Sequence, residues 1–254
     1  MVEIAGLKLP NPTMLAAGIL GLTGASLHEA ADKGAGAVVT KSVGLQPRKG
    51  YPNPTVVQVN CGLLNAMGLP NPSVQDFVEE IREVKRGEVN VPIIVSVYGF
   101  SAEEFAEVAS WFTGEAAGFE LNLSCPHAEG FGSALGTDPD LVEECTRAVK
   151  ALGRPTWVKV TPNVTEIAEI GRAAERGGAD AIVAINTVKA MRISVPMGRP
   201  ILGNRFGGLS GKAIFPIAIR GVSELYEACE VPVIGSGGTS TAAAVAARMM
   251  AGAR

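Results

Sequence analysis

Residues 31–40 read ADKGAGAVVT, and residues 174–183 read AERGGADAIV. In both stretches a helical pattern ends in small residues and a buried run of strand type begins, so the chain repeats a helix-to-strand junction. Repeated βα units in a chain of 254 residues favour a (β/α)8 TIM barrel over an open α/β sheet. An open doubly wound sheet is the alternative, but its glycine fingerprint after a first strand is missing.

Seven apolar runs of strand type alternate with stripes of helical spacing along the whole chain, which is typical of parallel strands joined by crossover helices. The runs are 14–17, 37–41, 93–98, 119–123, 156–160, 181–185 and 231–234. One helix is expected to begin at Asp138-Pro139, since Asp caps helices and Pro suits the first turn. No linker divides the chain, so we expect a single domain over residues 1–254.

The last residues, 247–254, match the helix-to-strand junction of the repeat. An eighth strand would begin where the sequence stops. We therefore expect seven barrel strands, with a gap between the first and the seventh or a partner segment that fills it. We also expect a sequence that is incomplete relative to the functional protein.

Charge and composition narrow the function classes. Lys plus Arg total 22 and Asp plus Glu total 25, a net charge of -3, which argues against a nucleic-acid binder and a polybasic membrane anchor. The longest uncharged stretch, residues 9–27, holds prolines and glycines and is a poor bilayer span. The start of the chain lacks a signal-peptide pattern, so we expect a cytoplasmic protein. The cysteines are too scattered for a metal site, and none is expected.

Polar residues follow the predicted strands where a barrel places its active site, at the carboxyl ends of the strands. They are Lys41, Ser42, Ser96, Asn122, Ser124, Cys125, Lys159, Asn186 and Thr187. Lysines inside a barrel need partners, because burying an unpaired charge is costly. The partner is either an anionic ligand or a barrel carboxylate. Glu120 is almost the only acid in the strand runs, so the ligand is favoured.

Two glycine-rich loops indicate phosphate binding. Gly235-Ser-Gly237-Gly238 precedes a helix after the seventh strand, and Gly207-Gly208-Leu-Ser-Gly211 follows the sixth. Backbone N–H groups at a helix N-terminus bind anions, and the loops after strands seven and eight form the usual barrel phosphate site. In residues 122–136, three glycines follow Cys125, which suggests a lid that carries a reactive group.

Taken together, these motifs resemble the class 1 dihydroorotate dehydrogenases, flavoprotein barrels of pyrimidine synthesis. The resemblance runs from residues 4–12 to the chain end. Its most specific pieces lie at residues 40–42, 65–71, 122–126, 158–160, 185–187, 207–211 and 235–238. Cys125, where the membrane-bound class carries Ser, implies class 1. The segments 136–139, 162–164 and 186–187 look most like class 1B.

The resemblance implies FMN as cofactor and roles for individual residues. The FMN phosphate would lie on Gly208, Gly237 and Gly238, and Lys159 would face the N1/C2 carbonyl edge of the flavin. Lys41 would lie between flavin and substrate, with Ser42, Ser96, Asn122 and Ile185 also at the cofactor. Asn65, Asn122, Asn186 and Thr187 would bind the dihydroorotate ring, and the backbone of Met67, Gly68 and Leu69 its carboxylate. Cys125 would take the C5 proton while hydride leaves C6 for flavin N5.

One position departs from the family. His127 stands where the pattern has a substrate-binding Asn, and a neutral imidazole still offers one donor and one acceptor. The class 1B likeness also implies a partner subunit with FAD and an iron–sulfur cluster, in a homodimer or heterotetramer. The alternatives are an FMN barrel for a related dihydropyrimidine, a class 1A-like fumarate-using enzyme, or a non-catalytic flavin or phosphate binder. Cys125 with the two lysines speaks against the last, since binding alone needs no base.

Overall fold

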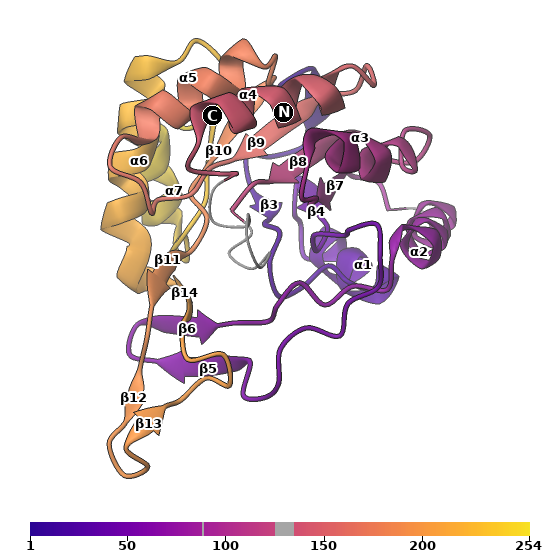
Figure 1. Ribbon diagram of the computed structural model, residues 1–254. Helices are drawn as coiled ribbons and strands as arrows, with labels where there is room; N and C mark the ends of the chain where they lie inside the picture. The colour runs from indigo at the N-terminus through magenta and orange to yellow at the C-terminus, as the bar shows by residue number, and fades with distance from the viewer. Residues whose placement is uncertain (88, 125–134) are drawn as a thin grey trace.

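The computed structural model describes residues 1–87, 89–124 and 135–254. Its centre is a curled sheet of seven parallel strands, with helices packed on the outside (Figure 1). In spatial order the strands are β3 (Met14–Leu15), β4 (Ala37–Val39), β7 (Ile93–Val97), β8 (Gly118–Asn122), β9 (Thr156–Lys159), β10 (Ala181–Ala184) and β15 (Val233–Gly235). All seven predicted runs are thus strands, mostly a residue or two shorter than predicted. They lie side by side in sequence order, which confirms the barrel type of fold.

Helices connect successive strands, and one more helix follows the last strand. They are α1 (Gly24–Asp32), α2 (Val74–Arg86), α3 (Ala102–Ser110), α4 (Pro139–Lys150), α5 (Ile167–Arg176), α6 (Phe215–Ala228) and α7 (Ala242–Met250), with the short η1 (Lys212–Ile214) before α6. The start of α4 is as predicted: the Asp138 side chain accepts from the backbone N–H of Asp140 at 3.0 Å, and Pro139 occupies the first turn. The apolar stripe of α2 from Val74 to Val84 has the helical spacing expected of a crossover helix and is buried.

Alternate residues of the strands face the two sides of the sheet, as the pleat requires. On the inner side, Ile94, Trp157, Val183 and Ile234 form one apolar cluster. Residues of the N-terminal hairpin, β1 (Val2–Ile4) and β2 (Leu7–Leu9), pack into this cluster. The barrel floor is therefore filled by side chains, and chemistry is confined to the opposite end.

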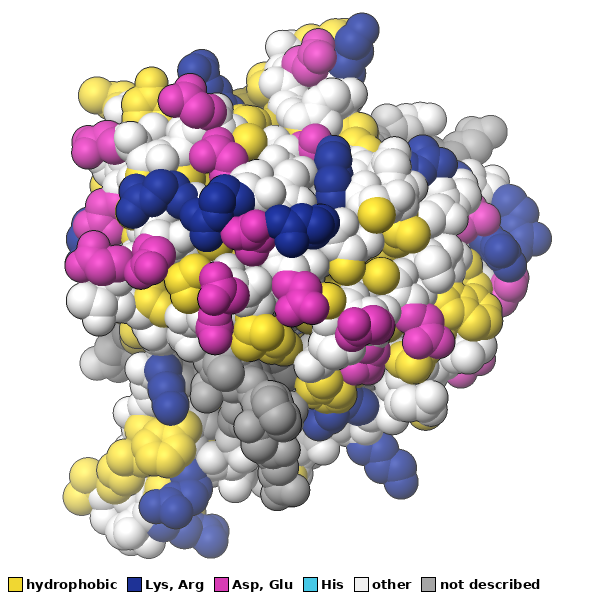
Figure 2. Space-filling model, turned by 45° about the horizontal axis from the view of Figure 1, so that its top comes forward, with side chains coloured by type: hydrophobic (Ala, Val, Ile, Leu, Met, Phe, Trp, Pro, Cys, Tyr) yellow, Lys and Arg dark blue, Asp and Glu magenta, His cyan; other side chains and the backbone are white. Residues whose placement is uncertain are grey.

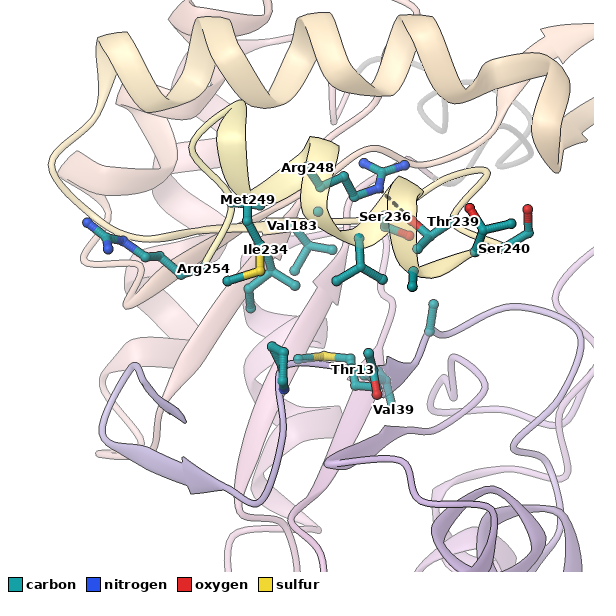
Figure 3. Close-up of a pocket in the computed structure, with 18 of the residues that line it drawn as sticks. Thr13, Val39, Val183, Ile234, Ser236, Thr239, Ser240, Arg248, Met249 and Arg254 are labelled. Carbon is teal, nitrogen blue, oxygen red and sulfur yellow. Dashed lines mark hydrogen bonds between the residues drawn. The ribbon is translucent and has the colours of Figure 1, made fainter. Parts of the chain in front are cut away.

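Strands β3 and β15 are the two edges of the seven-stranded sheet, which is the gap expected between the first and seventh strands. A cavity of about 450 Å³ lies there, with Thr13 and Val39 on one side and Ile234, Ser236 and Arg248 on the other (Figure 3). At the outer edge of β15, Ala253 forms a parallel bridge with Val233, and the Arg254 N–H donates to the Val233 carbonyl at 2.9 Å.

A second, antiparallel sheet stands beside the carboxyl end of the barrel and was not predicted. Its order is β11 (Val188–Ala190), β14 (Gly207–Ser210), β6 (Gly62–Asn65) and β5 (Val56–Val59). The small hairpin β12 (Ile193–Ser194) and β13 (Arg199–Pro200) extends from it as an arm (Figure 1). Two predicted site segments, 65–71 and 207–211, begin in this sheet, so it brings them to the mouth of the barrel.

The helical surface carries charges of both signs. Figure 2 shows Lys and Arg side chains interspersed with Asp and Glu on the visible face. Several are paired, for example Arg82 with Glu115 at 3.1 Å and Arg176 with Glu143 at 2.8 Å. Among the described residues, no helix is both long and apolar enough to cross a membrane.

Candidate active site

A pocket of about 170 Å³ opens at the carboxyl ends of the barrel strands, under the second sheet. Most of the residues predicted for substrate and cofactor line it together. They are Lys41, Ser42, Asn65, Met67, Gly68, Leu69, Asn122, Lys159, Asn186, Thr187 and Gly208. These residues come from four barrel strands or the turns after them and from two strands of the second sheet or the turn after one of them. Such a convergence from distant segments is what a barrel active site requires.

The amide side chains of the pocket are held by a polar network. The Asn186 Nδ2 donates to Asn122 Oδ1 at 3.1 Å, and the Asn122 Nδ2 donates to Ser42 Oγ at 3.0 Å. Ser96 does not line the pocket but lies directly behind it, with its hydroxyl 2.8 Å from that of Ser42. Both serines are buried. The network fixes the two amides before any ligand arrives.

Asn65 and Thr187 form the side of the pocket near the second sheet. The Asn65 Nδ2 donates to the Gly208 carbonyl at 3.2 Å, and the Thr187 N–H donates to Asn186 Oδ1 at 2.8 Å. A Cβ on Gly208 would lie 2.1 Å from Thr187 Oγ1, so the close approach requires glycine there. Ile185, predicted at the cofactor, is only 2% exposed and does not line the pocket.

Lys41 is buried, and its ammonium has no carboxylate within salt-bridge distance in the described part of the chain. Its Nζ donates to the Gly18 carbonyl at 2.7 Å and lies 3.7 Å from Met67 Sδ. Burial lowers the pKa of this amine to about 8. A buried cation that faces a pocket with only neutral acceptors is suited to an anionic ligand.

Lys159 differs from Lys41 in its partner. Its Nζ lies 3.4 Å from Glu120 Oε1 and 3.4 Å from the Ala17 carbonyl, and both ends of the ion pair are buried. The barrel-carboxylate alternative, which the sequence disfavoured, is therefore correct for Lys159. The reason is strand register, which puts Glu120 and Lys159 on the inner face of neighbouring strands.

The two glycine loops face each other beyond the pocket. Gly237 and Gly238 have φ of 100° and 79°, and a Cβ on Gly238 would lie 2.8 Å from the Gly211 carbonyl. From α7, Arg248 donates to the Gly237 carbonyl and, at 2.5 Å, to Thr239 Oγ1 (Figure 3). Arg248 is buried, and among the described residues its Nη1 has no hydrogen-bond partner.

Sequence reasoning missed Arg248. It is the only charged residue in the otherwise apolar α7, and a single charge in an apolar helix is the signal that identifies it.

Two predicted residues, Cys125 and His127, lie outside the described residues. Ser124, the residue before them, lines the pocket, and its buried hydroxyl has no hydrogen-bond partner in the part of the chain that the structure describes. The roles assigned to Cys125 and His127 stay predictions from the sequence.

Comparison with known proteins agrees with the motifs. The family model for dihydroorotate dehydrogenase matches residues 1–254. The dihydroorotate dehydrogenase B (NAD(+)) catalytic subunit of Methanosarcina mazei is 55% identical over 256 residues, covering 100% of this chain and 81% of the relative. The proteins of the same name are 57% identical in Methanocella arvoryzae (98% of this chain, 82% of the relative) and 49% in Pyrococcus abyssi (94% and 80%). The chain therefore belongs to the dihydroorotate dehydrogenase family of oxidoreductases, on its class 1B branch.

Proposed function

We propose that this chain is the catalytic subunit of an FMN-dependent enzyme that oxidises (S)-dihydroorotate to orotate in de novo synthesis of UMP. The observation that carries the proposal is the pocket at the barrel mouth, where three asparagines, Thr187 and the buried Lys41 converge. A ring with alternating amide and carbonyl groups and one carboxylate needs donors, acceptors and one cation. The pocket offers all three.

Substrate binding follows from these groups. Asn65, Asn122 and Asn186 each offer a donor and an acceptor to the ring. Lys41 lies beside Met67, where we place the substrate carboxylate, and supplies the opposite charge. The neighbouring Gly68 and Leu69 have positive φ, a local turn that allows several backbone N–H groups to point to one anion.

The residues present fit FMN. Gly208 lines the pocket with bare backbone, and close packing of Thr187 requires glycine at that position. The opposed loops at Gly211 and Gly237–Gly238 form a backbone cradle of the kind that binds phosphate. Lys159 supplies a fixed positive charge for the ring. When bound, FMN would supply the hydride acceptor.

Proton removal is assigned to Cys125, on sequence grounds. The thiolate would take the C5 proton of dihydroorotate while hydride leaves C6, so that a C5–C6 double bond forms. His127 is proposed as a substrate ligand in place of the family Asn. Both residues follow Ser124, which lines the pocket.

A partner subunit is part of the proposal. The relatives are named catalytic subunits of an NAD(+) enzyme, which implies another subunit for electron transfer. We propose that it carries FAD and an iron–sulfur cluster and joins this chain in a heterotetramer, with a homodimer as the alternative, in the cytoplasm. The chain purified alone should reduce a dye with dihydroorotate but not NAD at the same rate, and equal rates would contradict the need for a partner.

The deciding experiment is anaerobic reduction of the bound flavin. We expect dihydroorotate to bleach the flavin absorbance of the purified chain and dihydrouracil, which lacks the carboxylate, to do so far less. Equal bleaching by both would favour the related-dihydropyrimidine alternative. No bleaching by either would contradict the proposed function.

A further inference from the structure

The proposed function gives Lys159 a role at the flavin but gives no role to Glu120, its partner in a buried ion pair. Glu120 is 1% exposed and Lys159 is 4% exposed, so water screens neither charge well. Lys159 lines the active-site pocket, whereas Glu120 lines the cavity between β3 and β15. The pair therefore lies at the boundary between the two cavities, beneath the site.

Strand register explains how the two side chains meet. Asn122 of β8 pairs with Lys159 of β9, and Glu120 pairs with Trp157. Since residues two apart share a face, Glu120 lies one layer below Asn122 on the inner face. Its carboxylate reaches up to the Lys159 ammonium at 3.4 Å.

Positive charge exceeds negative charge in the lining of the pocket. The described residues that line the pocket include Lys41 and Lys159 but neither Asp nor Glu. Glu120 is the carboxylate that contacts a lysine of the site from beneath. Its charge thus offsets half of the positive charge in the pocket without contacting the ligand directly.

We propose that Glu120 is a positioning residue that holds the Lys159 ammonium from beneath the flavin site and, by its negative charge, lowers the reduction potential of the bound flavin. The inference rests on the proposed function, in which Lys159 faces the flavin ring. Two-electron reduction makes the ring anionic, so a nearby cation favours the reduced state and a nearby anion opposes it. Glu120 would therefore partly offset the effect of the Lys159 charge, so that the reduced flavin gives up its electrons more readily.

The variant Glu120→Gln tests the charge, because the glutamine Oε1 still accepts from Lys159. The measurement is the equilibrium of the bound flavin with a reference dye of known potential, under anaerobic conditions. We expect the variant to shift this equilibrium at least about tenfold toward reduced flavin, which is about 30 mV for a two-electron couple. Glu224→Gln is the matched control, since it breaks the exposed pair with Arg220 at 3.3 Å and should change nothing.

An unchanged potential, or a shift toward oxidised flavin, would overturn the inference. If Glu120→Gln does not fold, Glu120→Asp keeps the charge and should stay within about threefold of the wild-type equilibrium. A tenfold shift in that variant would also overturn the inference. A wild-type chain that binds no flavin would instead contradict the proposed function, so the two failures are distinguishable.

A second measurement needs no flavin. In the flavin-free protein, Glu120→Gln leaves Lys159 as an uncompensated buried cation and should lower the unfolding midpoint. Adding Lys159→Met to that variant should recover most of the loss. Additive losses in the double variant would show that the two side chains are not coupled and would contradict the inference.

Discussion

The floor of the barrel, at the amino ends of its strands, and the mouth, at their carboxyl ends, are built from the same strands. Their inward-facing side chains differ: those at the floor are mostly apolar, and those at the mouth are mostly polar. At the floor, Trp157 of β9 packs with Ile94 and Val183 in an apolar cluster. Two residues later on the same strand, Lys159 enters the active-site pocket. The inner face of this strand thus packs in the apolar cluster at its amino end and lines the candidate site at its carboxyl end, where the turns after the strands meet the second sheet. Substitutions at the floor should therefore change stability, and substitutions at the mouth should change activity.

The largest effect is expected from Cys125→Ala, the variant of the base that is assigned from the sequence. Loss of a general base should lower turnover with dihydroorotate by about two to four orders of magnitude, while flavin binding is retained. The measurement is dye reduction by the flavin-loaded protein. Cys61→Ala, at an exposed cysteine, is the control and should be fully active. More than about half of wild-type turnover in Cys125→Ala would refute the assignment.

At the floor, Trp157→Ala should lower the free energy of unfolding by about 3–5 kcal/mol, since it opens a cavity in a packed cluster. Chemical denaturation measures this loss. Trp111→Ala is a matched control because that side chain is 42% exposed, and it should cost less than about 1 kcal/mol. Similar losses for the two tryptophans would contradict the packed floor.

Lys41→Met should weaken dihydroorotate binding by about 10- to 100-fold, the contribution of a charge-assisted hydrogen bond. Since the pKa of Lys41 is lowered to about 8, Lys41 is cationic below that pH in the free protein and loses its charge as the pH rises through it. Wild-type affinity for orotate should therefore fall above about pH 8, and the variant should lose that dependence. Lys33→Met, at an exposed lysine, is the control. A variant that kept the wild-type pH profile would show that another group is responsible.

The smallest effect is expected behind the mouth. Ser96→Ala removes the bond to Ser42, which supports Asn122, and should cost about 0.5–1.5 kcal/mol in orotate affinity. Calorimetry with orotate gives the value. Ser110→Ala, on the exposed end of α3, should leave affinity unchanged. A lower free energy of unfolding with unchanged orotate affinity would show instead that Ser96 contributes to stability, as the floor residues do, and not to binding.

Much of the fold could be predicted because its signals are local. The seven strands and the capped start of α4 depend on residues close in sequence, such as Asp138 and Pro139. The second sheet was missed because β6 and β14 are short, glycine-containing strands that pair with each other although they lie far apart in the chain. These two strands lack a regular alternation of apolar and polar residues, so no periodic pattern predicts them.

The sequence by itself identified the candidate site residues, since Lys41, Asn122, Lys159 and Asn186 follow or end strands and match family motifs. Only the tertiary structure decided how they are paired. The two lysines look alike in sequence, yet one has Glu120 as partner and the other has backbone and sulfur acceptors. The physical reason is register: which side chains share a layer of the barrel depends on how neighbouring strands slide past each other, and hydrophobic periodicity does not report that offset.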